Sequence, residues 1–283
     1  MDQTKNYVCG SLFSIPDLRD YVAKSNVNEF PETFELSMPE VKNQGAVGSC
    51  VAHSLATATE YFNTKETNTT IKMSTGYIYG NRLLSTHKGT GMYTRDAIKT
   101  LAKFGNVPYE DFPYNVEVPY AIEKFEAEAD KLEERGLNYK VASYFKLNDD
   151  NAIKSHLLDG NPVIFAMKWF EDIKIENGVM ITNEVISNKT GGHCMVIYGW
   201  NTKGWLVQNS WGKNWGKNGR FTLPYNVSRK ETWGIIDAKS DSSLILEKPF
   251  KSKVGAFFAK VIHKVISWGY NLVAKLKEKK KEA

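Results

Sequence analysis

The sequence predicts an α+β fold built from two packed halves. In the first half, "CVAHSLATATEYF" (50–62) and "TRDAIKTLAKFG" (94–105) carry apolar residues at helical spacing. From residue 139 onward, the chain changes to short β-branched and aromatic runs separated by Gly, Asn and Pro, which is typical of strands. Because helices gather in the first half and strands in the second, we expect two subdomains of one α+β unit.

The expected elements follow the chain in order. Residues 1–40 are an irregular, proline-marked lead-in, and residues 41–238 form the main body. One helix starts near Cys50, a second ends at Gly105 as at a C-terminal cap, and a charged surface helix covers 119–136. Strands are expected at 139–145, 161–169, 178–186, 193–200, 205–211, 220–225 and 233–238.

Composition limits the class of protein. The 283 residues are 42% hydrophobic, enough for one large core or two half-domains with a cleft between them. The opening residues have no apolar run behind a basic start, so no secretory signal peptide is expected. Three cysteines are few and odd in number, which argues against a disulfide framework and favours a reducing, cytoplasmic location.

The positive charge of the chain is concentrated at its C-terminal end. Residues 251–283 hold nine lysines and two glutamates, whereas the whole chain has a formal net charge of only +5. The main body is therefore slightly acidic, and it lacks the aromatic-studded basic patch of a nucleic-acid-binding fold. Nucleic acid is not expected as a partner.

The stretch "QGAVGSC", residues 44–50, places a cysteine behind two glycines. Glycines allow a tight turn before the helix, and a thiol at a helix N-terminus meets the positive end of the helix dipole. That environment favours thiolate and would lower the pKa of Cys50. A buried structural cysteine is the commoner role for a lone Cys, so this stretch alone leaves both roles open.

A second stretch, "GGHCMVIYGWNTKGWLVQNSWGKNWGKNG", supplies the groups that a catalytic thiol needs. His193 starts a strand, and Asn209 follows in "NSWG". An imidazole can take the thiol proton, and an amide oxygen on the other ring nitrogen would hold the useful tautomer. Each residue alone has a plain structural explanation, but the three types in this order favour catalysis.

These motifs resemble the papain-like cysteine peptidases, peptidase family C1, over roughly residues 11–238. "NSWG-x-x-WG-x-NG" is the most specific piece, and "IPDLRDY" and "GTGMYTRDAIKTLAKFGNVPYEDFPY" resemble bacterial-type members. The resemblance implies a papain-like fold, with a cleft between a helical left half and a β-rich right half. It implies Cys50 as nucleophile, His193 as base and later acid, Asn209 as the residue that orients His193, and Gln44 as an oxyanion-hole donor. Trp211 would shield the His–Asn contact from water.

The resemblance also points to substrate contacts. Gly91 is the candidate for hydrogen bonding an extended substrate backbone, with Met92 and Tyr93 beside it as an apolar pocket; a surface turn is the alternative. Trp215 matches an aromatic wall on the leaving-group side. A protein or peptide substrate is implied, and no cofactor or metal.

Several positions depart from the family pattern. His53, one turn along the helix from the cysteine, is expected to be a packed histidine, because a side chain at i+3 points along the helix. The side chain of Cys194 should point into the core, on the face of its strand opposite to His193. No long inhibitory segment precedes Gln44, so autoprocessing of the usual kind is not expected.

The expected function is a cysteine-type peptidase, a thiol protease that hydrolyses peptide bonds through an acyl-thioester on Cys50. Two other classes stay open. Transpeptidation or isopeptide cleavage could use the same site. Alternatively, the protein is membrane-associated and its C-terminal cationic helix is the main functional element.

Residues 239–283 are expected to form a basic amphipathic helical extension. Apolar residues recur at helical spacing within 249–281, and lysines fall on the opposite side. This pattern suits either a helix at an anionic membrane surface, as in a peripheral membrane protein, or a helix docked on the catalytic body.

Overall fold

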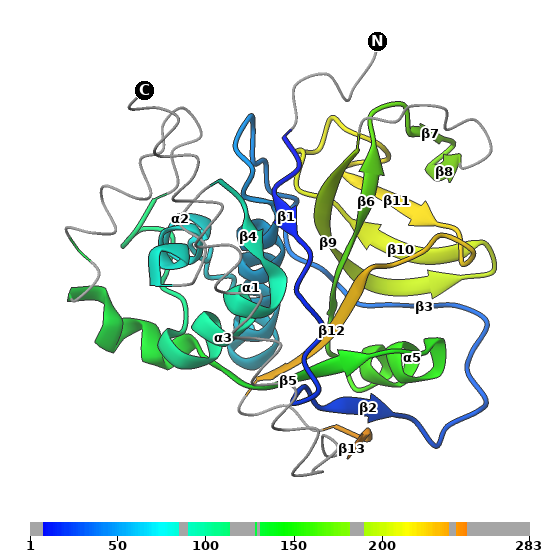
Figure 1. The fold of residues 1–283 in the computed structure, drawn as a ribbon, viewed down its shortest axis with the longest axis horizontal. Coiled ribbons are helices and arrows are strands. Elements are labelled where there is room, and N and C mark those ends of the chain that lie inside the picture. Colours follow the sequence, from blue (N-terminus) through cyan, green and yellow to red (C-terminus); the bar gives the residue numbers. More distant parts are fainter. Residues whose placement is uncertain are drawn as a thin grey trace, which may run out of the picture.

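A computed structural model of the chain describes residues 8–84, 90–113, 128, 131–181, 190–237 and 242–247. Two halves lie side by side, helices on the left and strands on the right (Figure 1). The left half holds α1 (Cys50–Thr67), α2 (Thr75–Gly80) and α3 (Thr94–Phe104), and α5 (Asp150–Leu158) lies in the right half. Two short 3-10 helices are η1 (Asn81–Leu84) and η2 (Leu137–Tyr139).

Most of the strands join one large sheet. The described strands are β1 (Ser11–Leu12), β2 (Val22–Lys24), β3 (Phe34–Glu35), β4 (Met92–Tyr93), β5 (Val141–Leu147), β6 (Val163–Phe170), β7 (Lys174–Glu176), β8 (Val179–Ile181), β9 (Thr190–Asn201), β10 (Gly204–Gln208), β11 (Arg220–Leu223), β12 (Glu231–Asp237) and β13 (Ile245–Glu247). The order in the large sheet is β13-β2-β5-β12-β6-β9-β10-β11-β8-β7, and β3 pairs with β9. Strands β1 and β4 form a separate parallel pair.

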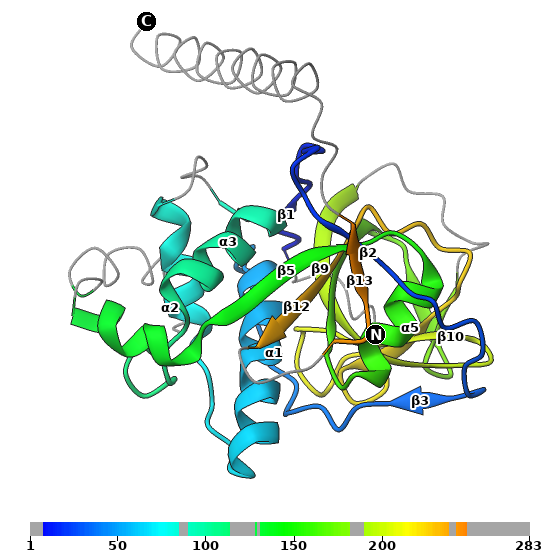
Figure 2. The same ribbon diagram turned by 90° about the horizontal axis from the view of Figure 1, so that it is seen from below.

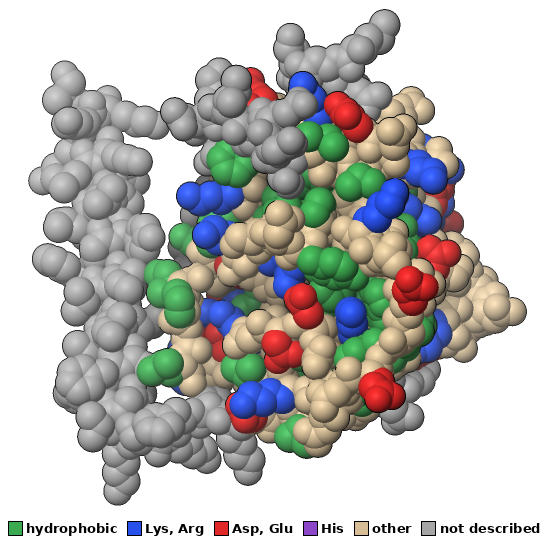
Figure 3. All heavy atoms as spheres, turned by 90° about the vertical axis from the view of Figure 1, so that its right-hand side faces the viewer, with side chains coloured by type: hydrophobic (Ala, Val, Ile, Leu, Met, Phe, Trp, Pro, Cys, Tyr) green, Lys and Arg blue, Asp and Glu red, His purple; other side chains and the backbone are tan. Residues whose placement is uncertain are grey.

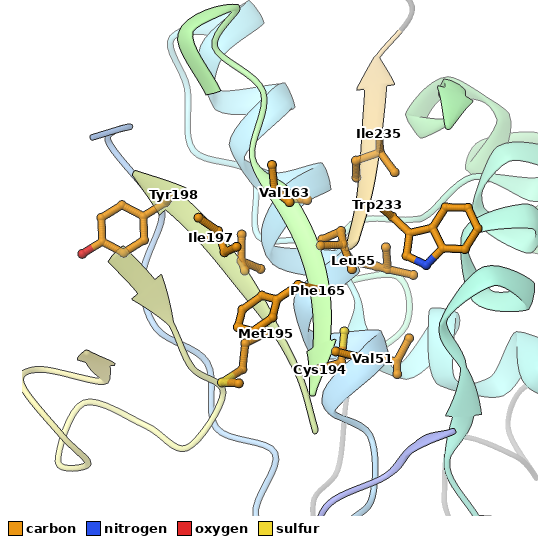
Figure 4. Close-up of a cluster of buried hydrophobic side chains, with 14 of the residues drawn as sticks. Val51, Leu55, Val163, Phe165, Cys194, Met195, Ile197, Tyr198, Trp233 and Ile235 are labelled. Carbon is orange, nitrogen blue, oxygen red and sulfur yellow. The ribbon is translucent and has the colours of Figure 1, made fainter. Parts of the chain in front are cut away.

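The two halves meet where α1 packs against β9. Every residue of α1 from Cys50 to Phe62 is buried, so this helix is surrounded by protein on all sides. Leu55 and Val51 of α1 lie in one apolar cluster with Phe165 of β6 and Cys194 of β9 (Figure 4). This continuous core fixes the start of α1 relative to β9, and both carry predicted site residues.

The helix expected at 50–62 is confirmed and extends to Thr67, and the helix expected at 94–105 is α3, capped by Gly105 at φ +74°. The expected strands in the second half are present in the described residues, with shifted ends. Residues 131–136 of the predicted 119–136 helix are helical, and most of the rest lies outside the described residues.

The described part of the lead-in is mostly irregular, but it also contributes three short strands, β1, β2 and β3. Strand β2 pairs with β5 on one side and with β13 on the other, so segments from early and late in the chain lie side by side in the large sheet (Figure 2). Strand β13 lies inside the range 239–283, where a helical extension is predicted. The predicted amphipathic helix within 249–281 lies outside the described residues.

No described helix is both long enough and apolar enough to cross a bilayer. On the right-hand face of the molecule, Lys and Arg side chains alternate with Asp and Glu (Figure 3). This face therefore carries no continuous basic patch.

Acid should weaken the fold through buried histidines, of which His156 gives the clearest test. Its ring is fully buried against the edge of Phe145, with ring centroids 5.4 Å apart. Burial lowers the pKa of His156 from 6.5 to about 3. Between these values the unfolded chain binds the proton and the folded chain does not, so stability falls as pH drops below 6.5.

His156→Leu should remove this contribution. Urea unfolding at pH 7 and pH 5 should show a smaller loss of stability in the variant, by at most about 2 kcal/mol. If the variant lost as much stability between pH 7 and pH 5 as the wild type, buried His156 would not be a source of the acid sensitivity.

Candidate functional site

The nucleophile candidate stands at the first residue of the central helix. Gly45 has φ +57°, a left-handed conformation that favours glycine, and its N–H donates to Asn43 Oδ1 at 3.0 Å. This turn leads to Ser49 and then to Cys50, where α1 begins. Gly48 has a different role: its missing side chain leaves room for Gly10, whose Cα lies 3.2 Å from where a Cβ of residue 48 would be.

The side chains of His193 and Asn209 are hydrogen-bonded to each other. Antiparallel pairing of β9 and β10 brings them together, and His193 Nε2 lies 2.7 Å from Asn209 Oδ1. That oxygen also accepts the Ser210 N–H at 2.8 Å, so the carbonyl side of the amide faces the ring. Nε2 must therefore carry the proton, which leaves Nδ1 as the basic nitrogen. His193 Nδ1 is buried and has no hydrogen-bond partner within the described part of the chain.

Tryptophans enclose this histidine. Trp211 stacks on the ring at 4.5 Å and 23°, and Trp169 meets it edge-on at 5.4 Å and 78°. Both indoles are nearly fully buried, so water is excluded from the His–Asn bond. The place of Trp211 agrees with the expected shielding role. Trp169 was missed, because it ends an ordinary strand pattern and belongs to no motif.

Trp215 lies behind this pair. Only 3% of it is exposed, and its ring contacts Trp169, Trp211 and Phe221 at centroid distances of 5.1–5.9 Å. The structure therefore gives it a supporting position in the aromatic cluster. Its predicted role as a wall on the leaving-group side stays a prediction.

Gln44 is held so that its amide nitrogen faces the cleft. Its Oε1 accepts a hydrogen bond from Ser210 Oγ at 2.6 Å, and its backbone N–H donates to the Ser210 carbonyl at 2.8 Å. Its Nε2 donates to the carbonyls of Val47 at 2.8 Å and Val8 at 2.9 Å. Since Ser210 also donates to Asn209, this one residue orients both amide side chains of the site.

The N-terminal segment fills the cleft; we call residues 8–15 the strap. It runs between the two halves as the dark blue ribbon labelled β1 (Figure 1). The Gly10 carbonyl accepts the Met92 N–H at 2.9 Å, and Ser11 and Leu12 pair in parallel with Met92 and Tyr93. A Cβ on Gly10 would overlap the Gly48 carbonyl oxygen, and one on Gly192 would overlap the Ser11 carbonyl oxygen. The strap therefore lies in van der Waals contact with both sides of the cleft.

Buried charges anchor the far end of the strap. Arg95, 8% exposed, donates its N–H to Ser14 Oγ at 3.1 Å and its guanidinium to the Ile15 carbonyl. The same guanidinium forms ion pairs with Asp20 at 3.1 Å and Asp17 at 3.7 Å. These contacts hold the strap to α3 of the left half.

The predicted substrate edge is where the strap lies. Gly91 has φ +84°, and a Cβ there would stand 2.5 Å from the Gly10 carbonyl oxygen. Met92 is buried and Tyr93 half-buried, next to the strap. This edge thus holds an extended backbone, although its binding of substrate stays a prediction.

Burial shifts the pKa values of the two candidate catalytic residues, Cys50 and His193. It raises the pKa of the Cys50 thiol, against an opposing effect from the N–H groups of Cys194 and Gly10. Burial also lowers the pKa of His193 to about 4, against the opposing bond to Asn209. The expectation of a lowered Cys50 pKa is therefore wrong for the covered site, because desolvation outweighs the helix terminus. Thiol and imidazole are both neutral beneath the strap.

The two other positions that depart from the family pattern lie as expected. His53 is buried, and its Nδ1 lies 3.0 Å from the Ser49 carbonyl of its own helix. Cys194 is fully buried among the core side chains of α1 and β6 (Figure 4).

Loosening the strap should expose Cys50. Gly10→Ala forces a methyl group against Gly48, and such overpacking costs about 1–3 kcal/mol, enough to raise the open population roughly 5- to 160-fold. We expect faster labelling of Cys50 by iodoacetamide, located by peptide mapping. Leu18→Ala is the matched control, because Leu18 is 61% exposed beyond the cleft. Equal labelling of Cys50 in the two variants would mean that the strap does not limit access.

Comparisons with known proteins agree with this geometry. The family model "Papain family cysteine protease" matches residues 30–240. An uncharacterized peptidase C1-like protein of Acanthamoeba polyphaga mimivirus is 31% identical over 208 residues, which are 67% of this chain and 65% of the relative. Vignain of Vigna mungo is 25% identical over 69% of this chain and 53% of its own length. The chain thus spans about half to two thirds of the length of these curated relatives.

Solved structures share the fold. Xylellain, a cysteine protease from Xylella fastidiosa, superposes with a TM-score of 0.71 at 25% identity, covering 82% of this chain and 96% of xylellain. Digestive procathepsin L 3 of Tenebrio molitor larval midgut gives a TM-score of 0.62 at 16% identity, covering 77% and 76% of the two chains. The predicted α+β papain-like fold is confirmed. With a family model matching most of its length, the chain belongs to the papain family of cysteine proteases.

Proposed function

We propose that the protein is a cysteine-type peptidase that hydrolyses peptide bonds through an acyl-thioester on Cys50. The observation that carries the proposal is the 2.7 Å bond from His193 Nε2 to Asn209 Oδ1, which leaves the basic Nδ1 free to act. The Cys194 N–H, one residue along, faces the Cys50 thiol and so brings the two catalytic side chains to one place.

Catalysis requires the strap to move aside. His193 Nδ1 then takes the Cys50 proton while the sulfur attacks the substrate carbonyl carbon. Gln44 Nε2, now released from the Val8 carbonyl, donates to the oxyanion together with the Cys50 N–H. The C–N bond breaks, His193 returns the proton to the leaving amine, and a thioester remains on Cys50. Water, deprotonated by His193, attacks this thioester and releases the carboxylic acid and the thiol.

Protein or peptide substrates follow from membership of the family. The strap supports an extended backbone as the bound form, since Ser11 and Leu12 pair with Met92 and Tyr93 in this conformation. An edge strand recognises the main chain of a substrate, and side-chain pockets add specificity.

The test is cleavage of a peptide library by the wild type beside Cys50→Ala. New amino termini made only by the wild type would support hydrolysis. Joined peptides would support transpeptidation, and release of side-chain-linked amines would support isopeptidase chemistry. Identical products from both proteins would overturn the proposal.

The C-terminal segment stays a prediction from sequence. If residues 249–281 bind anionic membranes in the cytoplasm, vesicle binding should weaken as salt rises.

A further inference from the structure

Cys9 of the strap lies at the catalytic centre, where neither the fold nor the proposed peptidase chemistry needs a thiol. Its neighbour Val8 places a carbonyl 2.9 Å from Gln44 Nε2. Its other neighbour, Gly10, directs its N–H at the Cys50 thiol. The two residues that flank Cys9 therefore contact Gln44, the proposed oxyanion-hole donor, and Cys50, the proposed nucleophile.

The side chain of Cys9 lies on the histidine side of the cleft. Its Cβ is 2.5 Å from where a Cβ of Gly191 would be, so only glycine fits at that position of β9. Gly191 and His193 are two residues apart in one strand and face the same side. Cys9 is half-buried and lies outside regular secondary structure, so its thiol can shift without breaking a strand or helix.

We propose that Cys9 is the resolving cysteine of a peroxide-responsive site, which closes by a Cys9–Cys50 disulfide and locks the strap over the nucleophile. The proposal rests on the proposed function in one respect: Cys50 is the thiol that ionises when the strap is open.

The chemistry balances with a peroxide as oxidant. The open Cys50 thiol reduces hydrogen peroxide, gaining one oxygen to become sulfenic acid and releasing water. When the strap returns, the Cys9 sulfur attacks the Cys50 sulfur. The S–S bond forms, the S–O bond breaks, and the hydroxyl leaves with the Cys9 proton as a second water. A dithiol such as dithiothreitol reverses the bond by exchange.

The closed site itself is protected from oxidation. Burial raises the pKa of Cys9 to about 12 and also raises that of Cys50, so neither is thiolate at neutral pH. Peroxide therefore acts on the open, active form and returns it to a closed form. A resolving cysteine also spares the nucleophile from oxidation beyond sulfenic acid, which is irreversible.

Cys194 is the competing partner, and the structure argues against it. It is fully buried in β9, its thiol hydrogen-bonds to Ser54, and its side chain packs with Val51 and Leu55 (Figure 4). A Cys50–Cys194 bond would require the α1–β9 core to move, whereas a Cys9–Cys50 bond requires only the strap to move.

The experiment uses the full chain, with Cys9→Ala and the matched control Cys194→Ala. Each reduced protein is treated with peroxide, free thiols are blocked, and a non-reducing digest is mapped by mass spectrometry. The wild type and Cys194→Ala should give a peptide linked through Cys9 and Cys50. Cys9→Ala should give none, and should accumulate Cys50 sulfinic acid.

Recovery of peptidase activity by dithiothreitol is the second readout. It should be nearly complete in the wild type and about 10-fold lower in Cys9→Ala, because sulfinic acid is not reduced. A Cys50–Cys194 link, no link at all in the wild type, or equal recovery in Cys9→Ala would overturn the proposal. The linked peptide forms whether or not the protein cleaves peptides, so failure of the proposed function would be seen separately.

Discussion

Cys50→Ala should abolish peptide hydrolysis, with a loss in kcat on the order of 10⁵-fold or more. His193→Ala should cost about as much, since thiol and imidazole act as one unit and removing either stops the first step. Both residues are fully buried in the site. The measurement is kcat on a fluorogenic peptide, after circular dichroism has shown that the variants fold.

The matched controls separate chemistry from packing. Cys194→Ala removes a buried thiol next to His193, and His53→Ala removes a buried imidazole one turn from Cys50. Both controls should lose stability yet retain turnover. Turnover that survives in Cys50→Ala would contradict the nucleophile assignment.

Gln44→Ala should lower kcat about 10²-fold and change KM little, as expected for an oxyanion-hole donor. The reason is geometric: Ser210 Oγ holds Gln44 Oε1 at 2.6 Å, so Nε2 is fixed toward the place where charge develops. Ser210→Ala should give a smaller loss in the same parameter, because the amide remains but loses its orientation.

Gln208→Ala is the control for this prediction. Gln208 is buried like Gln44, but its amide contacts Arg220 and the Pro39 carbonyl away from the site. The kcat of Gln208→Ala should equal that of the wild type. A kinetically silent Gln44→Ala would show that the oxyanion is stabilised by other groups.

The places of the candidate catalytic residues could be predicted in part, because these residues lie in recognisable sequence motifs. Cys50 stands at the predicted helix start. Asn209 lies inside the strand predicted at 205–211, whereas β10 ends one residue before it, at Gln208. The bond between His193 and Asn209 then follows from pairing β9 with β10.

The strap could not be predicted, because its contacts join residues far apart in the chain. Val8 meets Gln44, and Ser11 meets Met92, yet no periodicity marks "VCGSLF" as a strand. For the same reason, the raised pKa of Cys50 was missed: burial is a tertiary property that the local sequence does not report.

Helix α5 was not predicted for a different reason. It is a short helix between two strands, and its N-terminal signal is a single capping contact from Ala152 N–H to Asp149 Oδ1 at 2.7 Å. Strand β13 was missed because only pairing with β2 makes its three residues a strand.

Trapping the acyl-enzyme would show directly which side chain is the nucleophile. Wild-type protein is mixed with a nitrophenyl ester of a blocked amino acid, quenched in acid during the burst, digested and mapped. We expect one acyl group per chain, attached to Cys50 as a thioester and absent from Cys50→Ala. An acyl group on any other residue, or product formed by Cys50→Ala at the wild-type rate, would contradict this expectation.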